Sequence, residues 1–433
     1  MALGGGTFVT QNKVLPGPYI NFVSAASASA ALSKRGISTM PLALEWGPEG
    51  EVFEVTAGDF RKYSQKLFGY PYAHEKLKGL RDLFRNTRTL YAYRVGGGNK
   101  AKNTLAEAKN SGTRGNVITT AISANVDEPE KWDVRTYFAG ELVDEQKAVE
   151  TAADLKENDY VTFISGAELA ADAGTPLSGG SDVAPTTEDY RAYLEIIEGY
   201  SYNAMGVAVE DDATKELFIA FNKRMRDERG VKFQLVVHKH PADYLGVVNV
   251  KNDTLGESKC GLVYWTTGVV AGTEANKSAQ NKAYDGEFDV DVKLTQPQLE
   301  AAITNGEFVF HRVGSDIRVL ADINSMVTVS DTLGEVFKEN QTVRVIDQIA
   351  NDIAVLFNTK YLGVVPNDNA GRISLWGDIV KHHEQLQDLR AIEGFEDSDV
   401  TVAQGDSRKS VIVSDAITVV NAMDKLYMTV TVQ

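Results

Sequence analysis

Strict alternation of apolar and polar side chains marks residues 425–433, which read KLYMTVTVQ. One face carries Leu426, Met428, Val430 and Val432, and the other carries Tyr427, Thr429, Thr431 and Gln433. A period of two built from good strand formers predicts a β-strand. Because the stretch has no charged side chain after Lys425 and no proline, its main chain is open to pairing with another chain.

Helical periodicity recurs in several longer stretches. Apolar residues return every three to four positions in AGDFRKYSQKLFGY, HEKLKGLRDLFRN and DATKELFIAFNKRMRDERG, which predicts three helices. TVRVIDQIANDIAVLFNTKYLG and RISLWGDIVKHHEQLQDLRAI predict two more towards the end of the chain. Another helix is expected from Asp189 to Ile197, capped by Thr186 or Thr187.

Short apolar runs between these helices predict strands. GISTMPLALEW, EVFEV and TLYAYRV come early, and AMGVAVE and FQLVVHK flank the helix DATKELFIAFNKRMRDERG. The order strand, helix, strand predicts a parallel crossover, and GEFVFHRVGSDIRVLADIN predicts a hairpin. The region 100–184 contains strand-like runs separated by turn residues, which is typical of a small all-β unit.

The expected fold class is therefore a multidomain protein of mixed α/β and α+β type with extended arms at both ends. We expect an N-terminal arm at 1–23, an α/β unit at 24–99, a β domain at 100–184, an α/β domain at 185–342, a last unit at 343–424 and a terminal strand at 425–433.

Composition and charge narrow the classes of function. The chain has 433 residues, of which 43% are hydrophobic, and 44 Lys+Arg against 60 Asp+Glu give a formal net charge of −16. Binding to phosphate backbones and to anionic membranes relies on Lys and Arg, so we expect no nucleic-acid partner and no insertion into a membrane. No stretch has the length of a membrane span or the pattern of a secretory signal, which indicates folding in the cytoplasm.

Few residues point to catalysis or metal binding. His238 and His240 would share a face of a strand, but a metal pair there lacks a third ligand, and a turn at the strand end explains the pattern better. His382 and His383 are neighbours on a helix and cannot chelate together, so we expect them on a solvated helix surface or in a subunit contact.

Two further features have simple structural interpretations. Cys260 is the only cysteine, so no disulfide forms within the chain, and it lacks a local nucleophile signature, so we expect a small buried side chain. The glycines at 96–98 lack the Lys-Ser/Thr and the following helix of a phosphate loop. We predict no catalytic residue, no cofactor and no metal.

Two interpretations of residues 425–433 remain open. The strand either pairs within its own domain or is donated to the sheet of another copy, where it gains main-chain hydrogen bonds along its length. Three features favour donation: the first 23 residues are also extended and apolar, the run 410–433 exceeds an ordinary strand of roughly 5–6 residues, and VNAMD at 420–424 offers a joint.

Four stretches carry a resemblance to a known family: GGGTFVTQNKVLPGPYINFVSAA, PLSGGSD, TVRVIDQIANDIAVLFNTKYLG and DAITVVNAMDKLYMTVTVQ. Together they resemble contractile tail sheath proteins of PBSX-like prophages and of phage-tail-like bacteriocins. The likeness runs from end to end and is strongest near both ends. The family often has glycine after GGSD, where this chain has Val183.

The resemblance implies an architecture and a set of interfaces. The units 24–99 and 343–424 would form one discontinuous inner domain around a tail tube, and the units between them would be inserted and project outward. Hexameric rings would stack as a helix, with the N-terminal arm of one subunit and the C-terminal strand of another added to the sheet of a third. The interface residues carried over are Phe8, Val9, Tyr19, Ile20, Phe22, Leu426, Tyr427, Met428, Thr429, Val430, Thr431 and Val432.

The same resemblance implies a contraction that needs no nucleotide. The implied partners are further copies of the chain, a tail tube protein, and baseplate and sheath-terminating proteins. The helix at 373–392 would face the tube, with Lys381, His382, Glu384 and Gln385 as candidate contacts. Flexible joints are expected at 16–18 and 421–424. Assembly would occur in the host bacterial cytoplasm, before the product becomes a virion tail or a released tail-like particle.

Two other classes of function stay open. One is a non-contractile tail tube or baseplate component, although tube subunits are usually smaller and mostly β. The other is a cytoplasmic enzyme that uses the α/β region 185–342 as a binding fold, for which a concave pocket with convergent polar groups would be expected.

Overall fold

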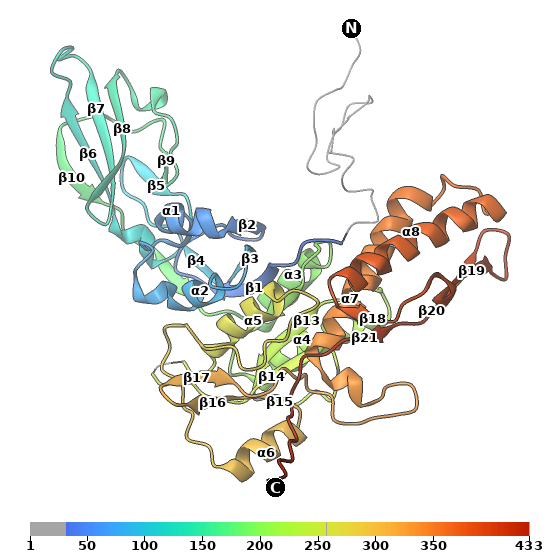
Figure 1. Ribbon diagram of the computed structural model, residues 1–433. Helices are drawn as coiled ribbons and strands as arrows, with labels where there is room; N and C mark the ends of the chain where they lie inside the picture. The colour runs from blue at the N-terminus through green and yellow to red at the C-terminus, as the bar shows by residue number, and fades with distance from the viewer. Residues whose placement is uncertain (1–31, 257, 433) are drawn as a thin grey trace. The chain divides into compact units, whose positions relative to one another are not determined.

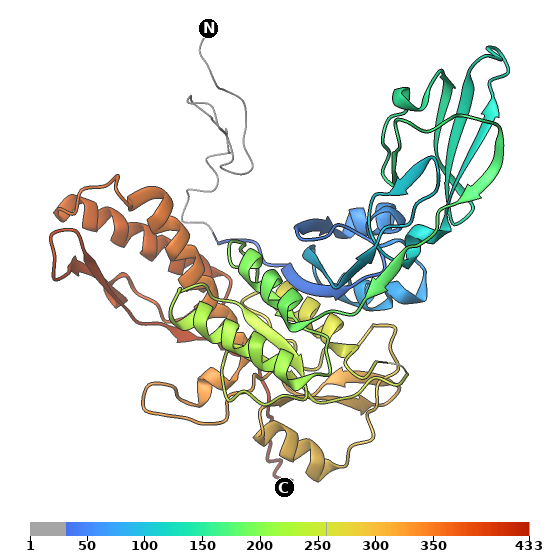
Figure 2. The same ribbon diagram turned by 180° about the vertical axis from the view of Figure 1, so that it is seen from behind.

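The computed structural model describes residues 32–256 and 258–432. This part of the chain divides into two compact units (Figures 1 and 2). The first unit comprises residues 34–347 and 421–432, and the second comprises residues 32–33 and 348–420. The predicted N-terminal arm at 1–23 lies outside the described residues.

A seven-stranded sheet forms the centre of the first unit. Its strand order is β15-β14-β13-β12-β1-β3-β2, and every neighbouring pair is parallel except β2 with β3. The strands are β1 (Ile37–Ala43), β2 (Val52–Thr56), β3 (Thr89–Val95), β12 (Ala204–Gly206), β13 (Gln234–His238), β14 (Val247–Val250) and β15 (Glu307–Phe308). β12, β13 and β14 are buried along their whole length, as expected for parallel strands covered on both faces.

Helices cover both faces of this sheet. One hydrophobic cluster contains Phe60, Leu80 and Trp265, and the other contains Tyr193 and Phe218, so each face has its own core. Figure 2 shows α3 and α4, drawn in green, side by side on one face. The helices of the first unit are α1 (Ala57–Phe68), α2 (Lys78–Leu83), α3 (Thr187–Ile197), α4 (Asp212–Asp227), α5 (Leu262–Gly272) and α6 (Gln296–Thr304).

Several local predictions are confirmed. β12 and β13 are parallel with α4 between them, which is the predicted crossover. The predicted hairpin is β16 (Phe310–Val313) with β17 (Asp316–Val319). Thr186 caps α3 through a capping box with Asp189.

The sheet corrects one prediction about domains. We expected residues 24–99 to form a domain with 343–424, but Ser38 of β1 pairs with Ala204 of β12, so β1 to β3 share a sheet with strands from 204–308. The physical reason is that β1 is buried and therefore needs a neighbouring strand on each side. β3 supplies one neighbour and β12 the other.

Antiparallel pairs fill the region between β3 and α3. The strands β6, β7, β8 and β10 lie together as one four-stranded sheet in the order β10-β6-β7-β8 (Figure 1). Alternate residues of β6 are buried, as the period of two requires for a sheet with one core face. The strands are β4 (Gly97–Asn99), β5 (Ala106–Ala108), β6 (Ile118–Ala124), β7 (Trp132–Phe138), β8 (Glu141–Val149), β9 (Val161–Phe163), β10 (Asp172–Pro176) and β11 (Ser181–Val183).

The chain enters and leaves this β region through a stem, the antiparallel pair of β4 and β11. The stem explains the glycines at 96–98 and the GGSD sequence, because these two stretches pair with each other. A Cβ atom on Gly98 would lie 1.7 Å from the carbonyl oxygen of Ser181, so only glycine fits there. Asp182 accepts a hydrogen bond from the main-chain N–H of Thr113 at 3.0 Å, which fixes the end of the stem.

The described residues of the second unit include two long helices, a π-helix at Phe357–Tyr361 and short antiparallel pairs. α7 (Asn340–Leu356) begins in the first unit and ends in the second, and α8 (Asn369–Asp388) follows it. Two strand pairs complete the unit: β18 (Ile392–Glu393) with β21 (Thr418–Val419), and β19 (Val400–Gln404) with β20 (Val411–Asp415).

The predicted terminal strand does not form among the described residues. Residues 420–432 belong to no strand, although their alternating pattern is typical of one. A strand is defined by its hydrogen-bonded neighbour, and this segment has none among the described residues.

Candidate assembly interface

The segment 426–432, which we call the tail, is exposed on both faces. Leu426 is 86% exposed, Tyr427 89% and Val432 90%, and Met428 and Val430 are also mostly exposed. No tail residue is hydrogen bonded to another residue in the part of the chain that the structure describes. The tail therefore combines apolar side chains with main-chain groups that have no partner in the chain, which is a surface suited to strand pairing.

The residues before the tail are held in place. Asn421 and Thr342 exchange side-chain hydrogen bonds, and the main-chain N–H of Ala422 donates to the side chain of Gln341 at 3.0 Å. We predicted a flexible joint at 421–424. The structure corrects this prediction, because the side chains of Gln341 and Thr342 form hydrogen bonds with Ala422 and Asn421.

The ribbon formed by β19 and β20 has two open edges. Among the described residues these two strands pair only with each other, and Ile412 and Val413 are exposed on β20. Trp376 of α8 attaches the ribbon by donating a hydrogen bond to the carbonyl oxygen of Val400 at 3.0 Å. A two-stranded ribbon is marginally stable alone, and its open edges can accept further strands.

The predicted contacts on α8 separate into two groups. Lys381 and Glu384 are exposed, and Gln385 is half-buried with its side chain donating to the carbonyl oxygen of Lys381. His382 is only 1% exposed, so the prediction that it makes a surface contact is wrong. Its Nε2 atom lies 3.0 Å from Asp352 of α7, so it joins two helices within the unit.

The pair His382 and His383 is buried, which corrects the expectation of a solvated surface or subunit contact. His383 lies with Nδ1 2.9 Å from the carbonyl oxygen of Ile379 and Nε2 3.0 Å from Asp415 at the end of β20. Burial raises the pKa of Asp352, but hydrogen bonds from His382, Ser33 and Gln348 outweigh that effect and leave the pKa below its usual value. Asp352 is therefore an ionised acceptor in the core of the unit.

His238, His240 and Cys260 each have a structural explanation. His238 is buried at the end of β13 with Nε2 3.1 Å from Asp253, and burial lowers the pKa of this imidazole. His240 is paired with Asp212 instead. Cys260 is buried, and burial raises the pKa of its thiol. Within residues 32–256 and 258–432 no group of three or more His, Cys, Asp or Glu side chains could hold a metal ion.

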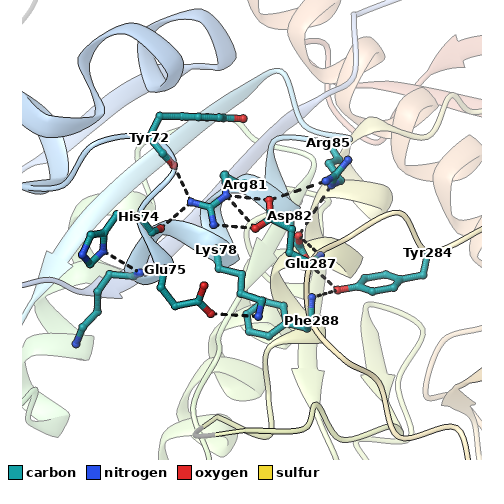
Figure 3. Close-up of polar contacts among 11 residues, drawn as sticks. Tyr72, His74, Glu75, Lys78, Arg81, Asp82, Arg85, Tyr284, Glu287 and Phe288 are labelled. Carbon is teal, nitrogen blue, oxygen red and sulfur yellow. Dashed lines mark hydrogen bonds and ion pairs between the residues drawn. The ribbon is translucent and has the colours of Figure 1, made fainter.

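A polar network that the sequence did not reveal ties α2 to residues 284–288 (Figure 3). The guanidinium of Arg81 donates to Glu287 through Nε and Nη2 at 2.8 and 2.7 Å, and through Nη1 to the carbonyl oxygens of Tyr72 and His74. The hydrogen bond from Arg81 lowers the pKa of Glu287. These groups satisfy one another, so the network is structural and leaves Arg81 no free face for an anion.

The buried carboxylate of Asp82 completes this network. It accepts hydrogen bonds from the Tyr284 hydroxyl at 2.7 Å and from the main-chain N–H of Glu287 at 2.8 Å, and burial raises its pKa. The residues it joins are about two hundred positions apart in the sequence. No periodicity or motif could have paired them.

The interface residues predicted at Phe8, Val9, Tyr19, Ile20 and Phe22 lie outside the described residues and stay predictions. None of the described helices has both the length and the apolar character needed to cross a membrane.

Family models match four consecutive parts of the chain. They are the N-terminal region of tail sheath protein domain III (35–95), the phage tail sheath β-sandwich domain (96–182), the phage tail sheath central domain (184–325) and the phage tail sheath C-terminal domain (332–433).

Curated relatives and solved structures agree with these matches. The phage-like element PBSX protein XkdK of Bacillus subtilis is 33% identical, with 99% of this chain and 100% of that protein covered. A crystal structure of a sheath tail protein from Desulfitobacterium hafniense is 34% identical, with a TM-score of 0.81 over 95% of this chain and 99% of that one. The contracted helical sheath of the anti-feeding prophage, 12% identical with a TM-score of 0.57 over 97% of this chain and 99% of that one, shares the fold. The resemblance read from the sequence is confirmed.

Proposed function

The chain belongs to the phage tail sheath protein family, and on that premise we propose that it polymerises as stacked hexameric rings around a tail tube and contracts to drive the tube through a target cell envelope. It is a structural subunit of a phage tail or tail-like particle. Assembly takes place in the bacterial cytoplasm, and copies are linked by exchange of their N-terminal arms and tails.

The exposed tail is the observation that carries this proposal. Its apolar residues and its main-chain groups lie in water in the single chain, and both become satisfied when the tail adds to a sheet. The ribbon of β19 and β20 offers edges of the same kind, so a tail from another copy can extend it. Strand pairing suits a moving assembly, because its hydrogen bonds involve only the main chain and survive rotation of the subunits.

In this proposal the free energy for contraction comes from burying apolar surface between rings, and no nucleotide is needed. Each buried Å² of apolar surface contributes about 25 cal/mol, so a modest gain per subunit becomes large when it is summed over a whole tail. The extended form is then a trapped state that a baseplate signal releases ring by ring. The structural neighbour from the anti-feeding prophage forms a helical sheath in a contracted state, which supports the proposal that this chain contracts.

Contact with the tail tube is assigned to the exposed side of α8, through Lys381, Glu384 and Gln385. His382 is not part of this assignment, since it is buried. Baseplate and sheath-terminating proteins are the partners proposed at the two ends of the polymer.

Deletion of residues 427–433 tests the proposal. The truncated chain should keep its circular dichroism spectrum and its unfolding transition but form no tubes, as measured by sedimentation and negative-stain electron microscopy. Met423→Ser is the matched control, because Met423 is fully exposed and lies outside the tail. Normal tubes from the truncated chain would contradict the proposal, and a small closed oligomer of the full chain would favour an enzyme.

A further inference from the structure

The strand β20 has little apolar contact with the rest of its unit. None of its five residues is buried, and Ile412 and Val413 are exposed. Apolar burial is the main source of attachment for most strands, and it contributes little here. The polar contacts of the ribbon therefore decide how firmly β20 is held.

Three side chains tie the ribbon to α8 and to the turn before it. Trp376 donates through Nε1 to the first residue of β19 at 3.0 Å, and Asn367 donates through Nδ2 to the residue just before β20 at 2.8 Å. His383 contacts Asp415, the last residue of β20, with Nε2 and Oδ2 3.0 Å apart. Of these three ties, only the one at His383 can change its charge near neutral pH.

The contacts of His383 favour a positive charge on its ring. Nδ1 lies 2.9 Å from the carbonyl oxygen of Ile379, which can only accept, so Nδ1 carries a proton. The Asp415 oxygen lies close to Nε2 but to one side of the direction of its N–H, so attraction between charges holds this contact. An unprotonated Nε2 would be repelled by the carboxylate. The ring is completely buried, and a buried charge needs such a partner.

The neighbouring His382 provides a contrast. Its Nε2 lies 3.0 Å from Asp352 of α7, but its Nδ1 is buried without a hydrogen-bond partner among the described residues. A second proton on His382 would therefore be left unsatisfied, which costs free energy. The rings of His382 and His383 are 5.4 Å apart, and two charged rings at that distance repel each other. The single positive charge therefore belongs on His383.

The other elements around His383 bring no further buried charge among residues 348–420. β19 reads VTVAQ and has no titratable side chain, and Glu393 of β18 is exposed. Phe395 covers the His383 ring at 5.1 Å between centroids and carries no charge. Lys381 and Glu384 of α8 are exposed. The titratable groups that face His383 are Asp415, His382 and, through His382, Asp352.

We propose that His383 and Asp415 form a proton-dependent latch, which fixes the end of β20 while the ring is charged and releases it as the pH rises. An unfolded histidine loses its proton near pH of about 6.5, so above that pH the folded chain binds a proton here that the unfolded chain does not. The stabilisation is therefore fully present below pH of about 6.5 and is lost as the pH rises further. The latch itself does not depend on assembly. Its consequence, that a released β20 is a poorer template for the tail of a second copy, rests on the proposed function.

Hydrogen exchange followed by mass spectrometry tests the latch. The full chain is labelled at several pH values between about 6 and 9, and each rate is divided by the intrinsic rate at that pH to give the protection. Protection of residues 411–415 should fall about tenfold across this range, which is the order expected for the loss of one charged contact. Residues 89–95 of β3 are mostly buried, and their protection should stay constant.

Three variants make the test specific. His383→Gln cannot hold the charge, and Asp415→Asn removes the anion at a position whose side chain is 27% exposed, so it stays informative if the first variant fails to fold. In both variants the protection of β20 should no longer depend on pH. Asp406→Asn is the matched control, because Asp406 is exposed in the turn between β19 and β20. It should keep the pH dependence of the unchanged protein.

The measurement is made at concentrations where light scattering detects no polymer, so that pairing with another copy does not protect β20. Constant protection of β20 in the unchanged protein would overturn the inference, and so would the same fall in all three variants. A fall that disappears in both latch variants, in a protein that forms no tubes at any concentration, would support the latch and reject the proposed assembly.

Discussion

Val236 and Val237 in β13 are completely buried, whereas Val430 in the tail is 69% exposed and Val432 is 90% exposed. Both stretches are short, apolar and built from good strand formers. β13 has a parallel neighbour on each side and helices over the sheet, and the tail has no neighbouring strand among the described residues. The difference teaches that neighbouring strands and helices, rather than residue types, decide which of these stretches forms a buried strand within one chain.

The largest loss of stability is expected from a substitution in the buried core around the seven-stranded sheet. Trp265 is fully buried against Tyr284 and Phe310, and its indole N–H donates to Asp285 at 2.7 Å. Trp265→Ala should lower the free energy of unfolding by about 3–5 kcal/mol, because it removes a large side chain and leaves a cavity. Urea unfolding followed by circular dichroism measures this. A loss below about 1 kcal/mol would mean that this core is not closely packed.

A smaller and pH-dependent effect is expected at the Arg81 network. The hydrogen bond from Arg81 lowers the pKa of Glu287 below its usual value of about 4.5, so the folded chain keeps this carboxylate ionised at a lower pH than the unfolded chain does. The stabilisation is therefore present above pH of about 4.5 and is lost as the pH falls through the lowered pKa. Glu287→Gln should destabilise the protein at pH 7, and the difference should shrink towards pH 3.

Urea unfolding between pH 7 and pH 3 measures this difference, with Glu335→Gln as the control. Glu335 is exposed and pairs only with Lys338 on the surface, so its substitution should change little at any pH. A difference for Glu287→Gln that stays constant with pH would show that the charge of Glu287 contributes nothing.

The smallest effect on stability is expected in the tail. Met428→Ser with Val430→Ser should change the free energy of unfolding of the unassembled chain by less than about 0.5 kcal/mol, since both side chains are already in water. The same variant should form far fewer tubes in a sedimentation assay. Thr429→Ser with Thr431→Ser keeps the polar face and serves as the control. A large loss of stability in the unassembled chain would mean that the tail packs on its own subunit.

Local elements and the pairing of strands close together in the sequence could be predicted, but neighbours that are distant in the sequence could not. The apolar run FQLVVHK and the helix before it predicted β13 and α4, because hydrophobic periodicity reports which faces are buried. Periodicity does not report which elements cover these faces, and for that reason the predicted domain of β1 is wrong. His382 was placed on the surface for the same reason, since its partner Asp352 lies on another helix.

The stem of β4 and β11 has a consequence for how such a chain can change over time. Because the chain leaves and rejoins the rest of the first unit at the stem, a change of length in an exposed turn far from the stem need not move the seven-stranded sheet. The exposed turn between β6 and β7 is such a place, whereas Phe138 and Ser111 are not, because Phe138 packs on Trp46 and Ser111 accepts a hydrogen bond from Arg94 of β3. The turn between β6 and β7 can therefore change in length over time, while the residues that contact Trp46 and Arg94 are held to their places.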